Sequence, residues 1–208
     1  SDSLRDVDVA DLLPRDEIHV DMEAIGKMLR DRTILITGAA GSIGSEMVRQ
    51  IAKYKPANMI LVDQAETPQH DILLMMKRKF PDIKNSVVVA SICQKGLMER
   101  IFANYHPDYV FHAAAYKHVP MMETEPSEAI LNNVRGTKYI ADLSVKYGVK
   151  KFVMISTDKA VNPTNVMGCS KRLCEIYTQS LNSAQQTTEF VTTRFGNVLG
   201  SNGSVIPI

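Results

Sequence analysis

The sequence has few cysteines, no excess of charge of either sign and no long apolar run, and each absence excludes a class of protein. Its three cysteines form no CxxC pair, which favours a reduced, cytoplasmic protein over a disulfide-rich secreted one. The 24 basic and 23 acidic residues nearly cancel, so no charged surface is expected to attract nucleic acid. No run of about 18 apolar residues could span a membrane, and no signal peptide opens the chain. The five histidines show no metal-ligand spacing, and no metal site is expected.

What is present is an ordinary globular composition. Apolar residues make up 45% of the 208 residues and charged residues 23%, enough for one domain with a hydrophobic core. Residues 1–30 are predicted to form an N-terminal arm and a short helix, and acidic and basic side chains alternate over the arm at 1–20, which contains Pro14. A short amphipathic helix is predicted to follow, with Asp21 as its cap. One face of that helix carries Met22, Ile25, Met28 and Leu29.

From residue 33 onward, short apolar runs alternate with helical periodicity. We predict strands at 33–37, 58–63, 86–90, 109–112, 151–155 and 190–193, and helices at about 42–53, 66–79, 97–104, 127–147 and 166–181. This alternation predicts an α/β domain over residues 31–208, in which helices cover both faces of a doubly wound parallel sheet. Dehydrogenases of this kind usually continue into a smaller C-terminal substrate lobe, which we expect to be truncated from this chain.

A glycine-rich turn lies between the first strand and the first helix of the predicted sheet. Residues 38–44 read GAAGSIG. Glycine at these three places permits a tight turn, close approach of the backbone to a pyrophosphate and close packing of helix on strand. The N-terminus of the helix adds free N–H groups and a positive dipole. The turn therefore predicts a dinucleotide-binding Rossmann fold, and the alternative is a glycine-rich turn that binds no ligand.

Asp63 ends the second strand, 25 residues after Gly38. A carboxylate there can accept hydrogen bonds from the adenosine ribose hydroxyls and would repel a 2′-phosphate. No arginine follows at 64–66 to bind such a phosphate. Asp63 therefore favours NAD over NADP, and the alternative is an ordinary loop carboxylate.

Polar residues 156–159 follow the fifth strand, at the carboxyl edge where an open α/β sheet binds its ligands. Met167 and Lys171 are four residues apart on the next predicted helix, so both can face the same crevice. Lys171 could donate to the nicotinamide ribose and raise the local positive potential. The alternative is that Asp158 and Lys159 form a solvated turn pair.

Four segments carry a specific resemblance. They are residues 37–46 (TGAAGSIGSE), 113–120 (AAAYKHVP), 132–137 (NNVRGT) and 156–171, and residues 194–200 (RFGNVLG) extend the match. Together they resemble the extended short-chain dehydrogenases/reductases, and more narrowly the capsular-polysaccharide-type UDP-N-acetylglucosamine 4,6-dehydratases. The resemblance covers about residues 30–208. Residues 4–13 resemble the segment that precedes the cytoplasmic catalytic domain in membrane-anchored bacterial members.

The resemblance assigns residues to three parts of a site. The phosphates would be held by Gly38, Gly41, Ser42, Ile43 and Gly44. The adenine would lie against Ser91 and Ile92, although many members carry an acid at position 91. The nicotinamide side would be lined by Ala113, Ser156, Lys171 and Val198, and the UDP-sugar would contact Lys117, Asn133 and Asn197. For Lys117 the alternative is an ordinary surface lysine.

Met167 stands where superfamily members normally carry a tyrosine that removes a proton as hydride leaves the substrate. A thioether cannot do this, but one branch of the family has methionine here. The base for the oxidation step is therefore open between Asp158, a water molecule and Thr157, in that order.

The resemblance implies a redox-neutral dehydration of UDP-N-acetylglucosamine that gives a 4-keto-6-deoxy sugar for surface polysaccharide. NAD takes a hydride from C4, the C5 proton and the C6 hydroxyl leave as water, and the hydride returns to C6. We expect Asp158 to be the acid and Lys159 the base. Lys159 must then be neutral part of the time, which burial or nearby Lys171 would favour.

Two other functions and two oligomeric states remain open. A UDP-sugar 4-epimerase would share the fold, and Met167 is compatible with a non-catalytic dinucleotide-binding protein. The two last predicted helices have apolar faces that could pair across a homodimer or pack on their own sheet. Those faces carry Ile130, Val134, Ile140 and Leu143 on the first helix, and Leu173, Ile176 and Leu181 on the second.

Overall fold

The chain forms a six-stranded, fully parallel sheet. The computed structural model describes residues 24, 26–113, 126–156 and 166–194. The strands are β1 (Thr33–Thr37), β2 (Asn58–Asp63), β3 (Asn85–Val89), β4 (Tyr109–His112), β5 (Lys151–Ser156) and β6 (Glu189–Arg194). Their order in space is β3-β2-β1-β4-β5-β6. The order reverses between β1 and β4, which is the doubly wound arrangement predicted from the sequence.

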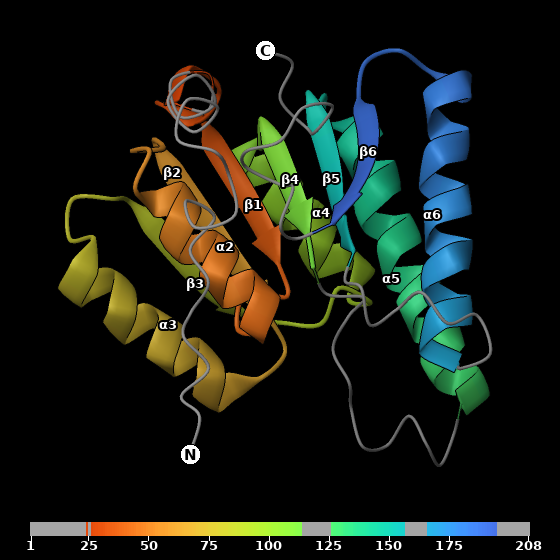
Figure 1. Cartoon of the computed structure of the whole chain (residues 1–208), viewed down its shortest axis with the longest axis horizontal. Helices are drawn as coiled ribbons and strands as arrows, with labels where there is room; N and C mark the ends of the chain where they lie inside the picture. Colours follow the sequence, from red (N-terminus) through yellow and green to blue (C-terminus); the bar gives the residue numbers. More distant parts are fainter. Residues whose placement is uncertain (1–23, 25, 114–125, 157–165, 195–208) are drawn as a thin grey trace.

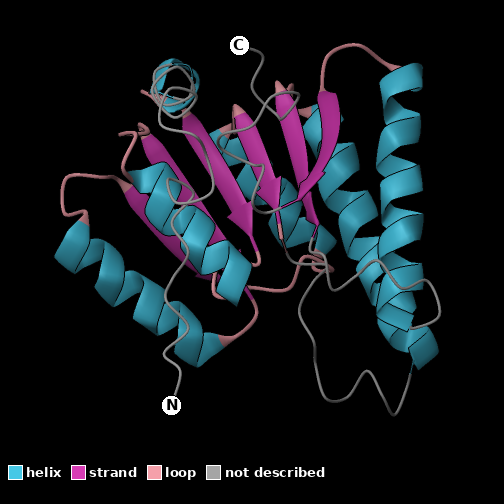
Figure 2. Ribbon diagram, viewed as in Figure 1, coloured by secondary structure: helices cyan, strands magenta, loops and turns pink. Residues whose placement is uncertain are grey.

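Helices connect the strands and cover both faces of the sheet (Figure 2). They are α2 (Ser42–Ala52), α3 (Glu66–Lys79), α4 (Lys95–Tyr105), α5 (Pro126–Lys146) and α6 (Val166–Ala184). Figure 1 shows α2 in front of the sheet and α4 and α5 behind it. Crossover helices cover both faces of a parallel sheet, so the interiors of the buried strands β1 and β2 (34–36 and 59–62) are continuous apolar runs and not alternating ones.

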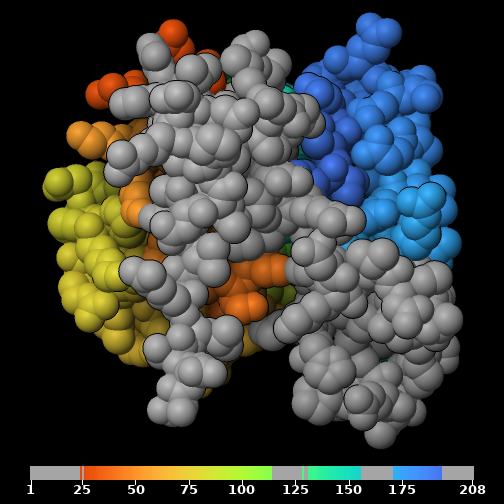
Figure 3. All heavy atoms as spheres, in the orientation of Figure 1, coloured from red at the N-terminus to blue at the C-terminus, as the bar shows by residue number. Residues whose placement is uncertain are grey.

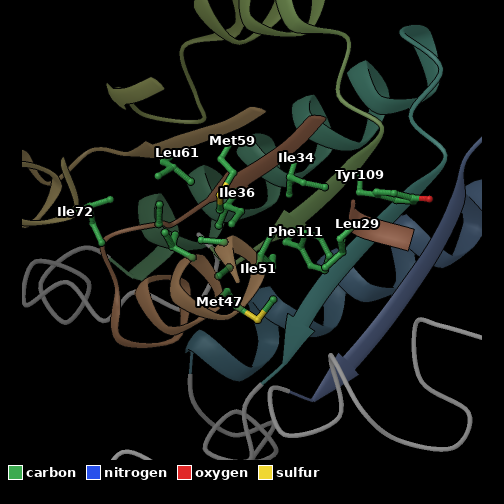
Figure 4. Close-up of a cluster of buried hydrophobic side chains, with 14 of the residues drawn as sticks. Leu29, Ile34, Ile36, Met47, Ile51, Met59, Leu61, Ile72, Tyr109 and Phe111 are labelled. Carbon is green, nitrogen blue, oxygen red and sulfur yellow. The ribbon is translucent and has the colours of Figure 1, made fainter. Parts of the chain in front are cut away.

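Two hydrophobic cores result, one on each face. The first packs Met47 and Ile51 of α2 and Ile72 of α3 against Ile34 and Ile36 of β1 (Figure 4). The second packs α4, α5 and α6 against the opposite face, and it is made around Phe102, Ile140, Leu35, Phe152 and Phe190. Successive residues of β1 thus point to opposite cores, as the period of a strand requires.

The predicted elements are confirmed, with changes at their ends. The bounds of β1, β2, β4 and α3 are as predicted, while α4 and α6 each extend by two or three residues beyond the predicted ranges. Residues 24 and 26–29 are helical, in agreement with the predicted N-terminal helix, and Leu29 is buried in the first core. Among the described residues, no helix is long and apolar enough to cross a membrane.

Two residues of the predicted apolar face of α6 do not pack on the sheet of their own chain. Leu173 and Ile176 are 49% and 52% exposed. The buried stripe instead carries Lys171, Cys174 and Thr178, which recur at helical spacing. On α5, Ile140 and Leu143 are buried in the second core and the partly buried Val134 packs against it. The side chain of Ile130 lies outside the described part of the structure.

Candidate cofactor and substrate site

The glycine-rich turn leaves the carboxyl end of β1 and enters α2. Gly38 has a φ of +70°, which favours glycine. Gly41 is the N-cap of α2, and the first intrahelical hydrogen bond runs from Ser45 N to Gly41 O at 2.8 Å. The amides of Ser42, Ile43 and Gly44 therefore precede any intrahelical acceptor. The first turn of α2 contains no acidic residue, so its dipole and amides are suited to an anion.

The second and third glycines meet different surroundings. A Cβ at Gly44 would lie 1.8 Å from the carbonyl oxygen of Gly38, so this glycine permits the close packing of α2 on the turn. A Cβ at Gly41 would lie 3.5 Å from the same oxygen, an ordinary contact. Gly41 is therefore not required by the packing of the described residues, and the space beside it suits an approaching phosphate.

Asp63 is bonded to the turn itself. Its side chain is buried at the end of β2, where Oδ2 accepts a hydrogen bond from Ala40 N at 3.1 Å and Oδ1 accepts one from Ala65 N at 2.9 Å. The carboxylate thus fixes the turn to the end of the neighbouring strand. The predicted contact with a ribose would add to this role.

The predicted adenine contacts lie in the β3–α4 connection and pack on α5. The hydroxyl of Ser91 accepts a hydrogen bond from Cys93 N at 3.2 Å, which holds the loop in a turn. Cys93 Sγ donates to Asn132 O of α5 at 3.3 Å. A Cβ at Gly136 would lie 2.5 Å from the Ile92 side chain, so a glycine on α5 lets the loop approach this closely.

A buried polar chain follows the carboxyl ends of β1 and β4. His112 Nδ1 lies 2.6 Å from the hydroxyl of Thr37, and His112 Nε2 lies 2.9 Å from the hydroxyl of Thr137 on α5. All three side chains are fully buried. Burial lowers the pKa of His112 to about 4. The thiol of Cys174 on α6 lies beside this chain, and burial raises its pKa while the hydrogen bond with Thr137 opposes the rise.

Lys171 of α6 is buried, and its Nζ lies 3.9 Å from a carboxylate oxygen of Glu175, one helical turn further on. Glu175 also pairs with exposed Arg172 at 3.4 Å. A buried ammonium needs such a partner, because desolvation of an unpaired charge is costly. Helix α6 forms one side of the molecule, and Figure 3 shows it in light blue on the right.

The structure brings together part of the predicted site. The turn at 38–44, Asp63, Ala113 and Ser156 all lie at or just after the carboxyl ends of β1, β2, β4 and β5, and Ala113 N donates to Thr37 O at 3.0 Å. Met167 lies in the first turn of α6, and Asn133 lies in α5. Six predicted residues lie outside the described residues: Lys117, Thr157, Asp158, Lys159, Asn197 and Val198.

The sequence analysis did not identify the residues that pack beneath the carboxyl edge of the sheet and contact the predicted site residues. They are His112, Gly136, Thr137, Cys174 and Glu175. The only signals for them were the histidine at the end of a predicted strand and the NNVRGT segment on the following helix. Within the described part of the chain, no cluster of three or more potential metal ligands occurs.

Comparison with known proteins agrees with this geometry. Residues 34–208 match the family described as polysaccharide biosynthesis protein. The chain is 48% identical over 207 residues to the capsular polysaccharide biosynthesis protein CapD of Staphylococcus aureus, covering 99% of this chain and 35% of that protein. It is 35% identical over 189 residues to the inverting UDP-N-acetylglucosamine 4,6-dehydratase of Campylobacter jejuni, covering 86% and 53%. It is 39% identical over 193 residues to a UDP-glucose 4-epimerase of Rickettsia canadensis, covering 87% and 53%.

Two solved structures show the same fold. The UDP-glucose 4-epimerase of Thermotoga maritima with UDP-glucose has a TM-score of 0.64 and 29% identity, over 78% of this chain and 54% of that one. The Bordetella bronchiseptica enzyme WbmG in complex with NAD has a TM-score of 0.64 and 25% identity, over 78% and 52%. The chain spans between about a third and a half of these relatives. It belongs to the polysaccharide biosynthesis protein family, within the extended short-chain dehydrogenases/reductases, and has their Rossmann fold.

Proposed function

We propose that the turn at 38–44 holds NAD as the resident cofactor of a nucleotide-sugar enzyme. The observation that carries the proposal is the turn at 38–44, because the amides of the first turn of α2 have no intrahelical acceptor and Asp63 fixes the turn to the end of β2. These residues fit a dinucleotide, since Gly44 provides close packing and Gly41 leaves room. The relative WbmG binds NAD in its crystal structure.

NAD is favoured over NADP. Asp63 lies at the end of β2 with only 4% of its surface exposed, and its carboxylate would face the adenosine ribose. A 2′-phosphate beside this buried carboxylate would be repelled. The three following residues, Gln64, Ala65 and Glu66, provide no cation to offset that repulsion.

For the reaction we propose 4,6-dehydration of UDP-N-acetylglucosamine, as in the Campylobacter jejuni relative. The bound cofactor would supply a hydride acceptor and donor at C4 and C6 of the sugar. Lys171 would hold the nicotinamide ribose, Ser156 and Ala113 would line the same side, and Lys117, Asn133 and Asn197 would contact the sugar nucleotide. These roles follow from the family resemblance and from the position of the carboxyl edge.

The chain's own acid and base would act on C5 and C6. A 4-ketone makes the neighbouring C5 proton removable, and Lys159 would accept that proton when it is neutral. Asp158 would donate a proton to the C6 hydroxyl so that water leaves. Met167 cannot exchange a proton, so the base for oxidation at C4 would be Asp158, directly or through water. Thr157 would be the alternative base for the oxidation step at C4.

The cofactor proposal is tested by replacing Gly41 with alanine. Its φ of −70° and the 3.5 Å contact allow alanine, so folding should be preserved. The added methyl group should weaken NAD binding by about tenfold or more in calorimetry, because the pyrophosphate needs close approach to the backbone. Gly96→Ala, where a Cβ meets nothing within 4 Å, is the matched control and should bind NAD normally. Equal affinity in both variants would contradict the cofactor site.

The reaction proposal is tested in the full-length protein that contains this chain. Incubation with UDP-N-acetylglucosamine should give a 4-keto-6-deoxy sugar, visible by NMR as conversion of the C6 protons to a methyl signal. Lys159→Ala should abolish this product, while Lys150→Ala, an exposed lysine before β5, should not. Normal turnover by the Lys159 variant would remove its role as base.

A UDP-sugar 4-epimerase is the second candidate, because the Rickettsia canadensis relative carries that name at 39% identity. An epimerase would invert C4 and leave C6 unchanged, so the same NMR experiment separates the two reactions. A protein that binds NAD without turning over either substrate would support a non-catalytic role.

We also propose that the intact protein is a homo-oligomer that uses α5 and α6. Leu131 of α5 and Leu173 and Ile176 of α6 are each about half exposed on these neighbouring helices. Leu173→Glu should shift the sedimentation coefficient of the full-length protein toward that of the monomer. Leu74→Glu on α3, which is 52% exposed, is the matched control. Sedimentation that is identical in both variants would remove α6 from the interface.

A further inference from the structure

The buried chain through His112 connects the end of β1, which precedes the glycine-rich turn, with α5 and α6, two helices that bear predicted site residues. Thr37 is the last residue of β1 and directly precedes Gly38, while Thr37 and His112 are register partners on adjacent strands. Thr137 lies one turn of α5 beyond Asn133. Cys174, bonded to Thr137, lies three residues beyond Lys171 on α6. The chain of bonds thus runs from the phosphate turn to both helices.

Both ring nitrogens of His112 lie within hydrogen-bond distance of a threonine hydroxyl, which can act as donor or acceptor. A neutral imidazole has one N–H donor and one acceptor nitrogen, and a threonine hydroxyl can donate or accept. Thr37 and Thr137 therefore satisfy either tautomer, with contacts of 2.6 and 2.9 Å. Phe152 packs against the ring, with centroids 5.6 Å apart, and both side chains are fully buried. Buried networks of this kind hold one geometry when every member is paired.

We propose that His112 is a positioning residue, which holds the dinucleotide turn at 38–44 in a fixed relation to α5 and α6. The inference rests on the proposed function for its ligand, NAD, but its geometry does not depend on it. His112 is too deeply buried to touch a cofactor or substrate, so it acts through Thr37 on the turn and through Thr137 on the helices. Removal of one hydroxyl leaves a buried ring nitrogen without a partner and frees the ring to reorient.

The test is a set of isosteric replacements with a matched control. Thr37→Val and Thr137→Val each delete one hydroxyl of the chain. Thr188→Val deletes another buried hydroxyl that also bonds to α5, through Ser144 O at 3.2 Å, but it lies just before β6 at the opposite edge of the sheet. Circular dichroism at the assay temperature confirms that each variant is folded.

NAD affinity of the full chain, measured by calorimetry, should fall by about threefold to tenfold in Thr37→Val and Thr137→Val, the effect of one lost hydrogen bond. It should be unchanged in Thr188→Val. Thr137→Ser keeps the hydroxyl and should restore wild-type affinity. In a His112→Asn background, Thr137→Val should cause no further loss of affinity, because the connection from Thr137 through His112 to the turn is already broken. Wild-type affinity in both threonine variants would overturn the inference.

A second measurement separates this inference from the cofactor proposal. Hydrogen exchange without any ligand should be faster at amides 38–44 in Thr137→Val than in the wild-type chain, although Thr137 lies on another element. Thr188→Val should leave these amides unchanged. A wild-type chain that binds no NAD contradicts the cofactor proposal alone, whereas unchanged exchange at 38–44 overturns the role of His112.

Discussion

Acid should destabilise this protein through His112. The folded-state pKa of this group is about 4, against 6.5 for an exposed histidine, because burial disfavours the imidazolium. Between pH 6.5 and pH 4, His112 is therefore protonated in the unfolded chain and neutral in the folded chain. The resulting stability is complete above pH 6.5 and is lost progressively as pH falls toward 4.

The size of the effect follows from the two pKa values. At pH 5 an unfolded histidine is almost fully protonated, while His112 in the folded chain is still neutral. The linkage relation then gives a loss of about 2 kcal/mol in unfolding free energy between pH 7 and pH 5. Most carboxylates remain ionised in this window, so they contribute little to the change.

The assay is urea unfolding at pH 7 and pH 5, followed by circular dichroism. His112→Asn removes the titrating ring while keeping a polar group near Thr37, so its unfolding free energy should change by about 2 kcal/mol less than that of the wild-type chain. Thr188→Val keeps His112 and should show the wild-type pH dependence. Equal pH dependence in wild type and His112→Asn would refute the reasoning.

Three further predictions concern the turn and its support. Gly44→Ala should cost more than about 3 kcal/mol of unfolding free energy in urea titration, because its Cβ would lie 1.8 Å from backbone that cannot move away. Gly136→Ala meets the flexible side chain of Ile92 at 2.5 Å and Cys93 Sγ at 3.4 Å, so thermal unfolding should report a loss of about 1–2 kcal/mol. Asp63→Asn can keep only one of two backbone bonds and should lower both unfolding free energy, by about 1–2 kcal/mol, and NAD affinity in calorimetry.

The sheet was predictable because its signals are local. A strand buried on both faces is a short continuous apolar run, and NMILVD of β2 ends at a charged residue that marks its carboxyl edge. The turn was predictable for the same reason, since all three glycines lie within seven residues of sequence. The predicted helix ends were less accurate, because backbone hydrogen bonds and capping residues determine where a helix ends, and apolar periodicity does not report them.

The support of the site was not predictable, because it depends on register. Thr37 and His112 are 75 residues apart, and Thr137 is 25 residues beyond His112. Only the pairing of β1 with β4 makes them neighbours. On α6 the large apolar residues Leu173 and Ile176 do not mark the stripe that is buried within the chain. Lys171, Cys174 and Thr178 are buried because α6 packs beside α5 and β6, where small and polar side chains fit.

Burial and positioning make separate demands on His112, and the experiments separate them. Loss of stability in acid requires only that the ring is buried, so a histidine in any apolar core would show it. Weaker NAD binding in Thr137→Val requires that a change on α5 reaches the turn through the ring. If the protein loses stability in acid but Thr137→Val binds NAD normally, His112 is only a buried core residue and does not position the turn. His112→Asn should be nearly insensitive to acid in this window and also bind NAD weakly, because one substitution removes both the buried titrating ring and the link to Thr137.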